Sequence, residues 1–366
     1  KKFNNFWMGK FLQQNNFIKP DKPVRLYGLD LARFLAFAGM VFVNFKVVMG
    51  AETGAIWAQS FLGFLEGKAA ATFVILAGIG LGIGAGRNAE NSFNLVILKR
   101  AGFLFVIGML NALIFPADIL HYYALYFVFG LLLIRQPVKV IAGVALLLPF
   151  IFLLLAAIFD YEAGWNWKTL DYAGFWSFEG FFRNLLFNGF HPLVPWMSFL
   201  LLGFILARLK LAQKRTHNML MLTGAVALGL AYLLSGFLSG LDPELAEISG
   251  VVPMPPMPLY MLAGSGAGVL VIGICLAVLS AGVHGRVFSW LKIFITTGRQ
   301  ALSLYIFHIF IGMGILEAFG LLGGLNSQIA VFAAGLFIIA SIIYATIWAR
   351  YFKGGPFELL MRRMTG

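Results

Sequence analysis

Long apolar runs recur along this chain from Leu31 to Trp348, and they constrain its fold more than any other feature. A membrane-spanning helix needs about 20 predominantly apolar residues, and fewer where neighbouring helices shield it. Only 11% of the residues are charged, whereas soluble domains carry about a quarter. The sequence therefore predicts an all-α, polytopic membrane protein with about ten transmembrane helices. The predicted spans are residues 31–49, 69–86, 101–115, 119–134, 138–159, 192–207, 218–238, 259–283, 301–320 and 328–349.

The spans leave no stretch long enough for a second, soluble domain. We predict one transmembrane domain over residues 25–366, with a tight hairpin at residues 115–118 between the short third and fourth spans. A tail of residues 1–24 precedes this domain and is polar, basic and aromatic. It has no long apolar core of the kind found in a cleavable signal peptide. Its alternation of aromatic and polar residues is compatible with a short interfacial helix.

The charges of the loops provide a test of this assignment. With ten spans, Lys and Arg gather in both tails and in every second loop, and Asp and Glu dominate the other loops. Lys and Arg accumulate on the cytoplasmic side of membrane proteins. We therefore predict cytoplasmic N- and C-termini, in the inner membrane of a bacterium. The net charge of +12 is explained by this topology, so we expect the lipid bilayer, and no nucleic acid, as a partner.

The only cysteine, Cys275, lies inside an apolar run. A single cysteine excludes an intrachain disulfide and a C-x-x-C redox or zinc site. We predict no bound metal.

Polar residues inside or beside the spans are candidates for function, because they are costly in a bilayer. Sorted by predicted depth, they form two clusters. The cytoplasmic cluster holds Asp30, Arg33, Arg100, Arg299 and His308. The outer cluster holds Asn44, Lys68, Asp118, His121, His191 and Glu317.

The spacing of these residues indicates which of them act together. Asp30 and Arg33 are three apart, and Arg33 and Asn44 are eleven apart, so all three share one helical face. This face is either an ion pair that anchors the helix or the lining of a cavity. Asp118 and His121 are also three apart. The carboxylate would orient the imidazole of a general base, or the histidine simply belongs to an interfacial aromatic belt.

Two further histidines lie at span ends, and each has a structural alternative. His191 directly precedes the sixth span, where it is an interfacial residue or a base beside His121. His308 lies about two turns into the ninth span, where it bonds to a neighbouring helix or borders a ligand. The glycines of residues 78–86 predict close helix packing, which leaves a homodimer open.

The motifs that carry these residues also carry a family resemblance. Residues 25–33, 67–73, 118–125, 191–196 and 354–360 occur in the order found in the YeiB-like and heparan-alpha-glucosaminide N-acetyltransferase-like membrane families, which they resemble. Residues 303–308 resemble the closing helix of integral membrane acyltransferases. The resemblance covers nearly the whole chain.

This resemblance implies a transmembrane acyltransferase that moves an acyl group, usually acetyl, from cytoplasmic acetyl-CoA to a hydroxyl or amine of a sugar or glycan on the far side. Eukaryotic members use a histidine in the first outer loop. This sequence has none between Met49 and Phe64, so His121 or His191 would replace it. The predicted catalytic residues are His191, His121, Asp118, Asn44 and Lys68. The predicted cofactor-binding residues are Arg299, Arg100, Arg33, Asp30 and His308.

A second hypothesis is a transporter of a small solute or a lipid-linked intermediate, without covalent chemistry. Such proteins often contain internal repeats, and the two halves of this sequence show no convincing similarity. Proton-coupled pumps often keep a carboxylate at mid-span, and no Asp or Glu falls there in the predicted spans. The sequence therefore favours the enzyme.

Overall fold

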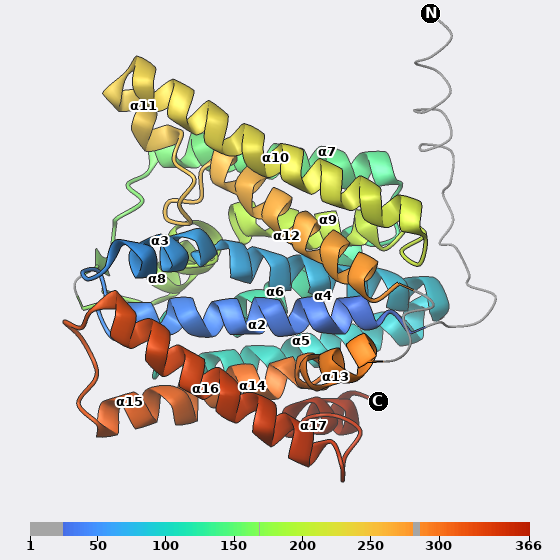
Figure 1. The fold of residues 1–366 in the computed structure, drawn as a ribbon. Coiled ribbons are helices and arrows are strands. Elements are labelled where there is room, and N and C mark those ends of the chain that lie inside the picture. The colour runs from blue at the N-terminus through green and yellow to red at the C-terminus, as the bar shows by residue number, and fades with distance from the viewer. Residues whose placement is uncertain (1–24, 168, 281–285) are drawn as a thin grey trace, which may run out of the picture.

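The computed structural model describes residues 25–167, 169–280 and 286–366, and the expected interfacial helix of residues 1–24 lies outside them. The described chain is almost entirely helical (Figure 1). Its first half contains α2 (Tyr27–Val48), α3 (Ile56–Leu65), α4 (Lys68–Arg87), α5 (Glu90–Ala112), α6 (Leu120–Leu133), α7 (Val138–Ile158), β1 (Trp165–Asn166), β2 (Asp171–Tyr172), α8 (Phe178–Arg183) and the π-helix η1 (Asn184–Asn188). Its second half contains α9 (Leu193–Leu206), α10 (Lys214–Leu241), α11 (Pro243–Ile248), α12 (Pro258–Val278), α13 (Arg286–Gly298), α14 (Ala301–Phe307), the π-helix η2 (His308–Met313), α15 (Gly314–Ala318), α16 (Ser327–Trp348) and α17 (Pro356–Thr365).

The predicted all-α membrane fold is confirmed. Within the described residues, eight helical segments are long and apolar enough to cross a membrane. A ninth span results if residues 178–188 and 193–206, which meet at 48°, count as one bent span. The remaining predicted span is α6, whose 14 residues extend over about 21 Å. It is shorter than a bilayer core of about 30 Å, so the count of ten is reached only with α6 included.

The long helices run side by side, with α2 and α4 in the middle of the bundle (Figure 1). The pair α10 and α12 lies on one side, and α14 and α16 lie on the other. The start of α2, α13, α17 and the C-terminus lie at one end of the bundle, whereas α3, α8, α11 and α15 lie at the opposite end.

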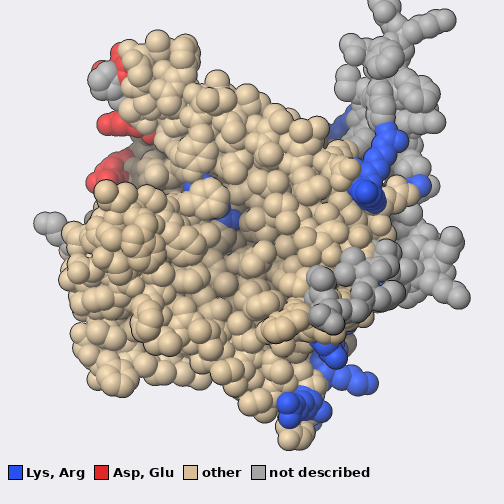
Figure 2. Space-filling view, in the orientation of Figure 1, with Lys and Arg blue, Asp and Glu red and all other residues tan. Residues whose placement is uncertain are grey.

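The charges separate along the same axis (Figure 2). Lys and Arg gather at the end that holds the C-terminus, and Asp and Glu gather at the opposite end. The broad band between them shows no charged side chain on this face except a small patch of Lys or Arg. We call these the basic end and the acidic end. The positive-inside rule predicts that the basic end is cytoplasmic.

Glycines allow neighbouring helices in the middle of the bundle to touch through their backbones. A Cβ atom on Gly78 of α4 would lie 2.3 Å from the Leu200 carbonyl oxygen of α9, and one on Gly203 would lie 2.3 Å from the Ile75 carbonyl oxygen. A Cβ atom on Gly298 would lie 1.9 Å from the Asp30 carbonyl oxygen. The predicted close packing is thus present at Gly78, and the end of α13 is fixed against the start of α2.

Candidate active site

A cavity of about 820 Å³ enters the bundle from the basic end. Four of the five predicted cofactor-binding residues line it, namely Asp30, Arg33, Arg100 and Arg299. Its inner part is lined by the side chains of Phe73 and Tyr123 and by Leu120, and it is therefore largely apolar. A volume in this range is typical of sites that enclose a cofactor or a drug-sized ligand.

Asp30 organises one wall of this cavity. Its carboxylate is buried and accepts hydrogen bonds from Arg33 Nη1 at 2.6 Å and from Arg25 Nη2 at 2.9 Å. A carboxylate at this depth is stable because two guanidinium groups neutralise it. The Asp30–Arg33 pair therefore anchors the helix and also lines a cavity, which combines the two interpretations that the spacing allowed.

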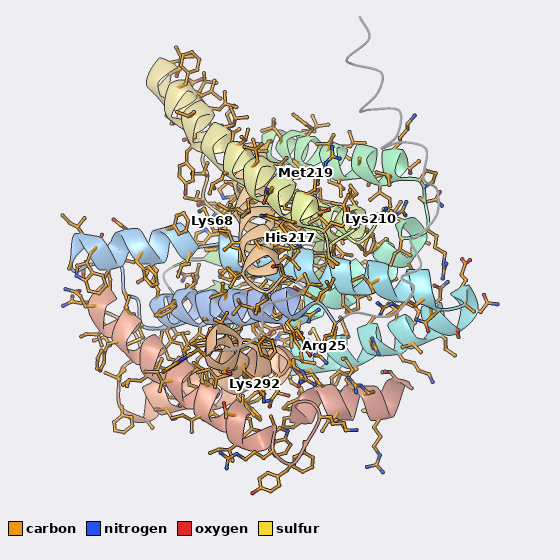
Figure 3. All side chains as sticks on the ribbon, turned by 45° about the vertical axis from the view of Figure 1, so that its right-hand side comes forward. Arg25, Lys68, Lys210, His217, Met219 and Lys292 are labelled. Atoms are coloured by element: carbon orange, nitrogen blue, oxygen red, sulfur yellow. The ribbon has the colours of Figure 1, made fainter. Side chains whose placement is uncertain are left out.

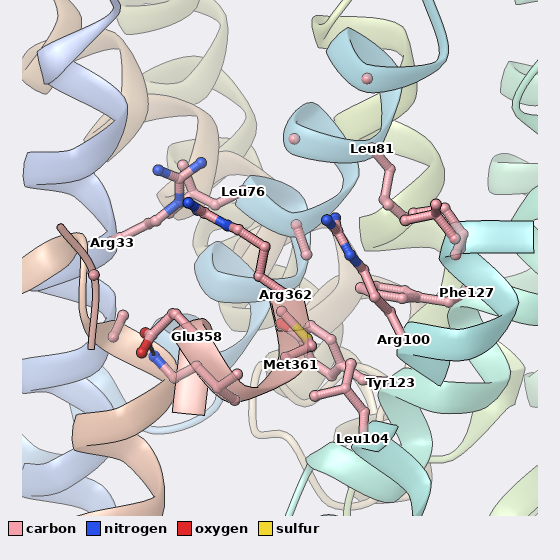
Figure 4. Close-up of a pocket in the computed structure, with 18 of the residues that line it drawn as sticks. Arg33, Leu76, Leu81, Arg100, Leu104, Tyr123, Phe127, Glu358, Met361 and Arg362 are labelled. Atoms are coloured by element: carbon pink, nitrogen blue, oxygen red, sulfur yellow. Dashed lines mark hydrogen bonds between the residues drawn. The ribbon is translucent and has the colours of Figure 1, made fainter. Parts of the chain in front are cut away.

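Arg100, on the opposite wall, has no such partner. Its Nε atom is buried without a hydrogen-bond partner among the described residues. Figure 4 shows Arg33, Arg100 and Arg362 directed into the same space, with Arg362 between the other two. The described residues hold no acidic side chain within ion-pair distance of Arg100 or Arg362. Guanidinium groups in this arrangement match the geometry of phosphate oxygens.

A second, smaller pocket of about 60 Å³ faces the acidic end. Asn44 of α2 and His191, just before α9, both line it, together with Glu66, Ala70 and Ala117. A cavity needs about 10–15 Å³ by this measure to hold one water, so the pocket has room for a small group and is far smaller than the cavity at the basic end. It unites two of the five predicted catalytic residues.

The pocket and the cavity nearly meet. On α4, Ala70 lines the pocket and Phe73 lines the cavity, which is a rise of about 4.5 Å along one helix. At the start of α6, Ala117 lines the pocket and Leu120, the first residue of the helix, lines the cavity. Residues three apart in the chain thus line the two spaces at both places, and the protein between them forms the layer that separates the spaces.

Asp118 belongs to this layer and holds the hairpin between α5 and α6. Its buried carboxylate accepts hydrogen bonds from Asn111 Nδ2 at 2.8 Å and from the Leu120 backbone N–H at 2.7 Å. The Nδ1 atom of His121 lies 3.5 Å from Asp118 Oδ2, which is too long for a good hydrogen bond. Both ring nitrogens of His121 are buried without a hydrogen-bond partner. Asp118 therefore orients the hairpin more than it orients the imidazole.

His308 lies at a different depth from the one predicted. It does not line the cavity, and its Nε2 atom lies 2.9 Å from Asn44 Nδ2. Its Nδ1 atom contacts the Tyr305 carbonyl oxygen and must carry a proton there, so the neutral ring accepts from the Asn44 amide. The predicted depth is wrong because α14 begins inside the protein: Ser303 is completely buried and lies beneath α17.

Lys68 also lies apart from the other predicted catalytic residues of the outer cluster. Its side chain is buried, yet it lines neither the pocket nor the cavity. Its Nζ atom lies 5.8 Å from the centre of the Tyr232 ring of α10. Figure 3 labels Lys68 close to this helix. Lys68 is the first residue of α4, its ammonium group lies against α10, and the structure does not bring it to the pocket that holds Asn44 and His191.

The segment before α9 fixes the place of His191. Asn188 is fully buried and donates to the carbonyl oxygens of Ala163 and Tyr161, at 2.8 and 3.0 Å. The Tyr126 hydroxyl donates to the His191 carbonyl oxygen at 2.5 Å. The Nδ1 atom of the His191 ring is buried without a hydrogen-bond partner. The imidazole is thus held at the pocket wall by its backbone and keeps a nitrogen free for chemistry.

Two residues that line the cavity, Glu358 and Arg362, were not predicted as site residues. Arg362 entered the sequence argument only as one of the basic residues of the C-terminal tail, and Glu358 only as part of the motif at residues 354–360. The sequence offered one signal for them: residues 354–360 and residues 303–308 both belong to segments that resemble membrane acyltransferase families. The structure places these two segments in contact, because Phe357 N donates to Ser303 Oγ at 2.9 Å.

The fold and this divided site define an integral membrane protein with several spans and two spaces, each lined in part by charged or polar side chains, that approach each other inside the bundle. The chain belongs to the family described as heparan-alpha-glucosaminide N-acetyltransferase, catalytic, which matches residues 25–237. Residues 204–366 match a second family, described as a protein of unknown function (DUF418). The predicted resemblance is therefore confirmed. Comparisons with curated proteins and with solved structures gave no match.

Proposed function

We propose that this protein transfers an acyl group, most simply acetyl, from cytoplasmic acetyl-CoA to a hydroxyl or amine of a sugar that reaches the acidic end. The family name supports acetyl transfer. The proposal rests on one observation: a large cavity lined by arginines and a small pocket lined by a histidine approach each other inside the bundle. A donor and an acceptor that arrive from opposite ends need such a junction.

The cavity suits the donor. Arg33, Arg100 and Arg299 at its mouth would bind the phosphate groups, and Asp30 would hold Arg33 in place. The pantetheine arm, about 20 Å long by bond count, would lie along the apolar inner part beside Phe73. This arm places the thioester at the layer between the two spaces.

The pocket suits the acceptor and the reacting atoms. His191 removes the proton as the acceptor oxygen or nitrogen attacks the thioester carbon. The Asn44 amide keeps one N–H free after its bond to His308, and it stabilises the negative oxygen that develops. The carbon–sulfur bond then breaks, and the CoA thiolate receives the proton.

His191→Ala tests the proposal in purified full-length protein, with acetyl-labelled CoA and a panel of amino sugars and neutral sugars. Loss of a general base lowers the transfer rate by about 10²- to 10⁴-fold, while CoA binding stays at the wild-type level. His217→Gln is the control, because this buried histidine bonds the Leu211 carbonyl oxygen and lines neither space.

Three results would contradict the proposal. One is a folded wild-type protein that neither binds CoA nor transfers acetyl to any acceptor of the panel. Another is accumulation of an unmodified solute in proteoliposomes without any covalent change, as the transporter hypothesis requires. Loss of CoA binding in His191→Ala would remove His191 from the role of base.

A further inference from the structure

The C-terminal helix α17 is attached to the beginning of α14 by an unusual cap. The Glu358 carboxylate accepts hydrogen bonds from the backbone N–H groups of Leu302 and Ser303, at 2.9 and 3.3 Å, and from the Ser303 hydroxyl. The first N–H groups of a helix have no partner within that helix. Glu358 supplies the missing acceptor from a second helix that lies 55 residues away in sequence.

The approach of α17 to α14 leaves no space for a side chain. A Cβ atom on Gly355 would lie 2.5 Å from Ser303 Oγ and 2.3 Å from Glu358 Oε2. Gly355 is followed at once by Pro356, the first residue of α17, whose ring suits a first helical position. The residues of α17 therefore have a defined place relative to the cavity mouth.

From this place, the Arg362 side chain reaches into the cavity. Arg362 is four residues after Glu358, so both lie on one face of α17. Figure 4 shows its guanidinium group between those of Arg33 and Arg100. Two carboxylates line the cavity, and both are already engaged: Asp30 binds Arg25 and Arg33, and Glu358 caps α14. The basic side chains that line the cavity therefore outnumber the acidic ones, and neither Arg100 nor Arg362 forms an ion pair among the described residues.

We propose that Arg362 is a phosphate-binding residue, which with Arg33 and Arg100 forms a three-arginine site for the phosphate groups of the acyl donor. This inference rests on the proposed function. It makes α17 a wall of the donor site, and it makes Glu358 and Ser303 positioning residues that hold this wall. The shared ligand chemistry is a phosphate ester, which either CoA or an anionic phospholipid headgroup can supply.

The test measures binding to the full-length protein in detergent, with labelled CoA, with adenosine 3′,5′-bisphosphate and with pantetheine. Arg362→Ala is expected to weaken the binding of CoA and of the bisphosphate by roughly tenfold, since bonds to charged groups lie at the upper end of hydrogen-bond strengths. Pantetheine, which has no phosphate, is expected to bind equally to both proteins. The control is Arg363→Ala, because Arg363 is exposed and does not line the cavity.

Equal CoA affinity of the Arg362→Ala and Arg363→Ala proteins, with normal binding and transfer by the wild type, would overturn this inference and leave the proposed function standing. A wild-type protein that binds no CoA would overturn both. Phosphatidylglycerol micelles separate the two sources of phosphate: if they bind through Arg362 and CoA does not displace them, the donor assignment is wrong. Matching thermal unfolding of the two variants shows that a loss of affinity is local.

Discussion

The contact between Ser303 and α17 can be broken with the loss of a single oxygen atom. The Ser303 hydroxyl donates to the Glu358 carboxylate and accepts from the Phe357 backbone N–H at 2.9 Å. Ser303→Ala removes both bonds and leaves a carboxylate oxygen and an N–H group without their partner. The fold of α14 should survive, because the other Glu358 oxygen still caps it.

The expected magnitude follows from these two bonds. A hydrogen bond to a charged group contributes about 1.5–3 kcal/mol, and a partly buried N–H group without a partner adds up to about 1 kcal/mol. The docking of α17 should therefore weaken by about 1.5–4 kcal/mol. At about 1.4 kcal/mol per factor of ten, the open state of α17 should become roughly 10- to 700-fold more populated.

Hydrogen exchange of the α17 amides measures this population, since local opening controls exchange. Ser198→Ala is the matched control, because the Ser198 hydroxyl is buried in α9 without a hydrogen-bond partner among the described residues. Its loss should leave α17 unchanged. If the α17 amides exchange equally in the Ser303→Ala, Ser198→Ala and wild-type proteins, the hydroxyl does not hold α17 and the reasoning fails.

Two further changes test neighbouring parts of the site. Asn44→Ala removes the proposed oxyanion donor, so transfer should fall by about 10²- to 10³-fold with unchanged CoA binding; a variant that keeps full turnover would exclude the amide from the chemistry. Burial raises the pKa of Glu358 above its ordinary 4.5, although hydrogen bonds from Ser303 and the backbone oppose the shift. Because the folded state then binds the proton more tightly, the docking of α17 should be strongest below pH 4.5 and weaken as the pH rises through the raised pKa. In the wild type, the exchange rate of the α17 amides, corrected for intrinsic exchange, should increase as the pH rises through this range. In Glu358→Gln the corrected rate should not change with pH. The same pH dependence in both proteins would show that a group other than Glu358 causes it.

The sequence predicted the helices and the grouping of four cavity-lining residues well, because both depend on local pattern. Apolar runs set the helix positions, and basic residues on one side of the membrane necessarily meet at one end of the bundle. Asp30, Arg33, Arg100 and Arg299 were grouped in this way, and they line one cavity. Their role in binding a donor stays a prediction.

The sequence could not give the direction or depth of residues whose position depends on a neighbouring helix. Helical spacing predicts on which face of its helix His308 lies. Its depth in the bundle depends on the burial of the start of α14 beneath α17. Lys68 turns towards Tyr232 because α10 packs there, and no local pattern records this contact. Arg362 resembles any other basic residue of a cytoplasmic tail until α17 is placed.

The two family matches overlap at residues 204–237 and otherwise divide the chain. The cavity at the basic end is lined by residues from both parts. Arg33, Arg100 and Tyr123 come from the part matched as an acetyltransferase, whereas Arg299 and Arg362 come from the part matched only as a protein of unknown function. Asn44 likewise depends on His308, across the same division. If donor binding and the proposed chemistry both need residues from each part, the C-terminal part belongs to the active site. The two family matches then cover two parts of a single functional unit.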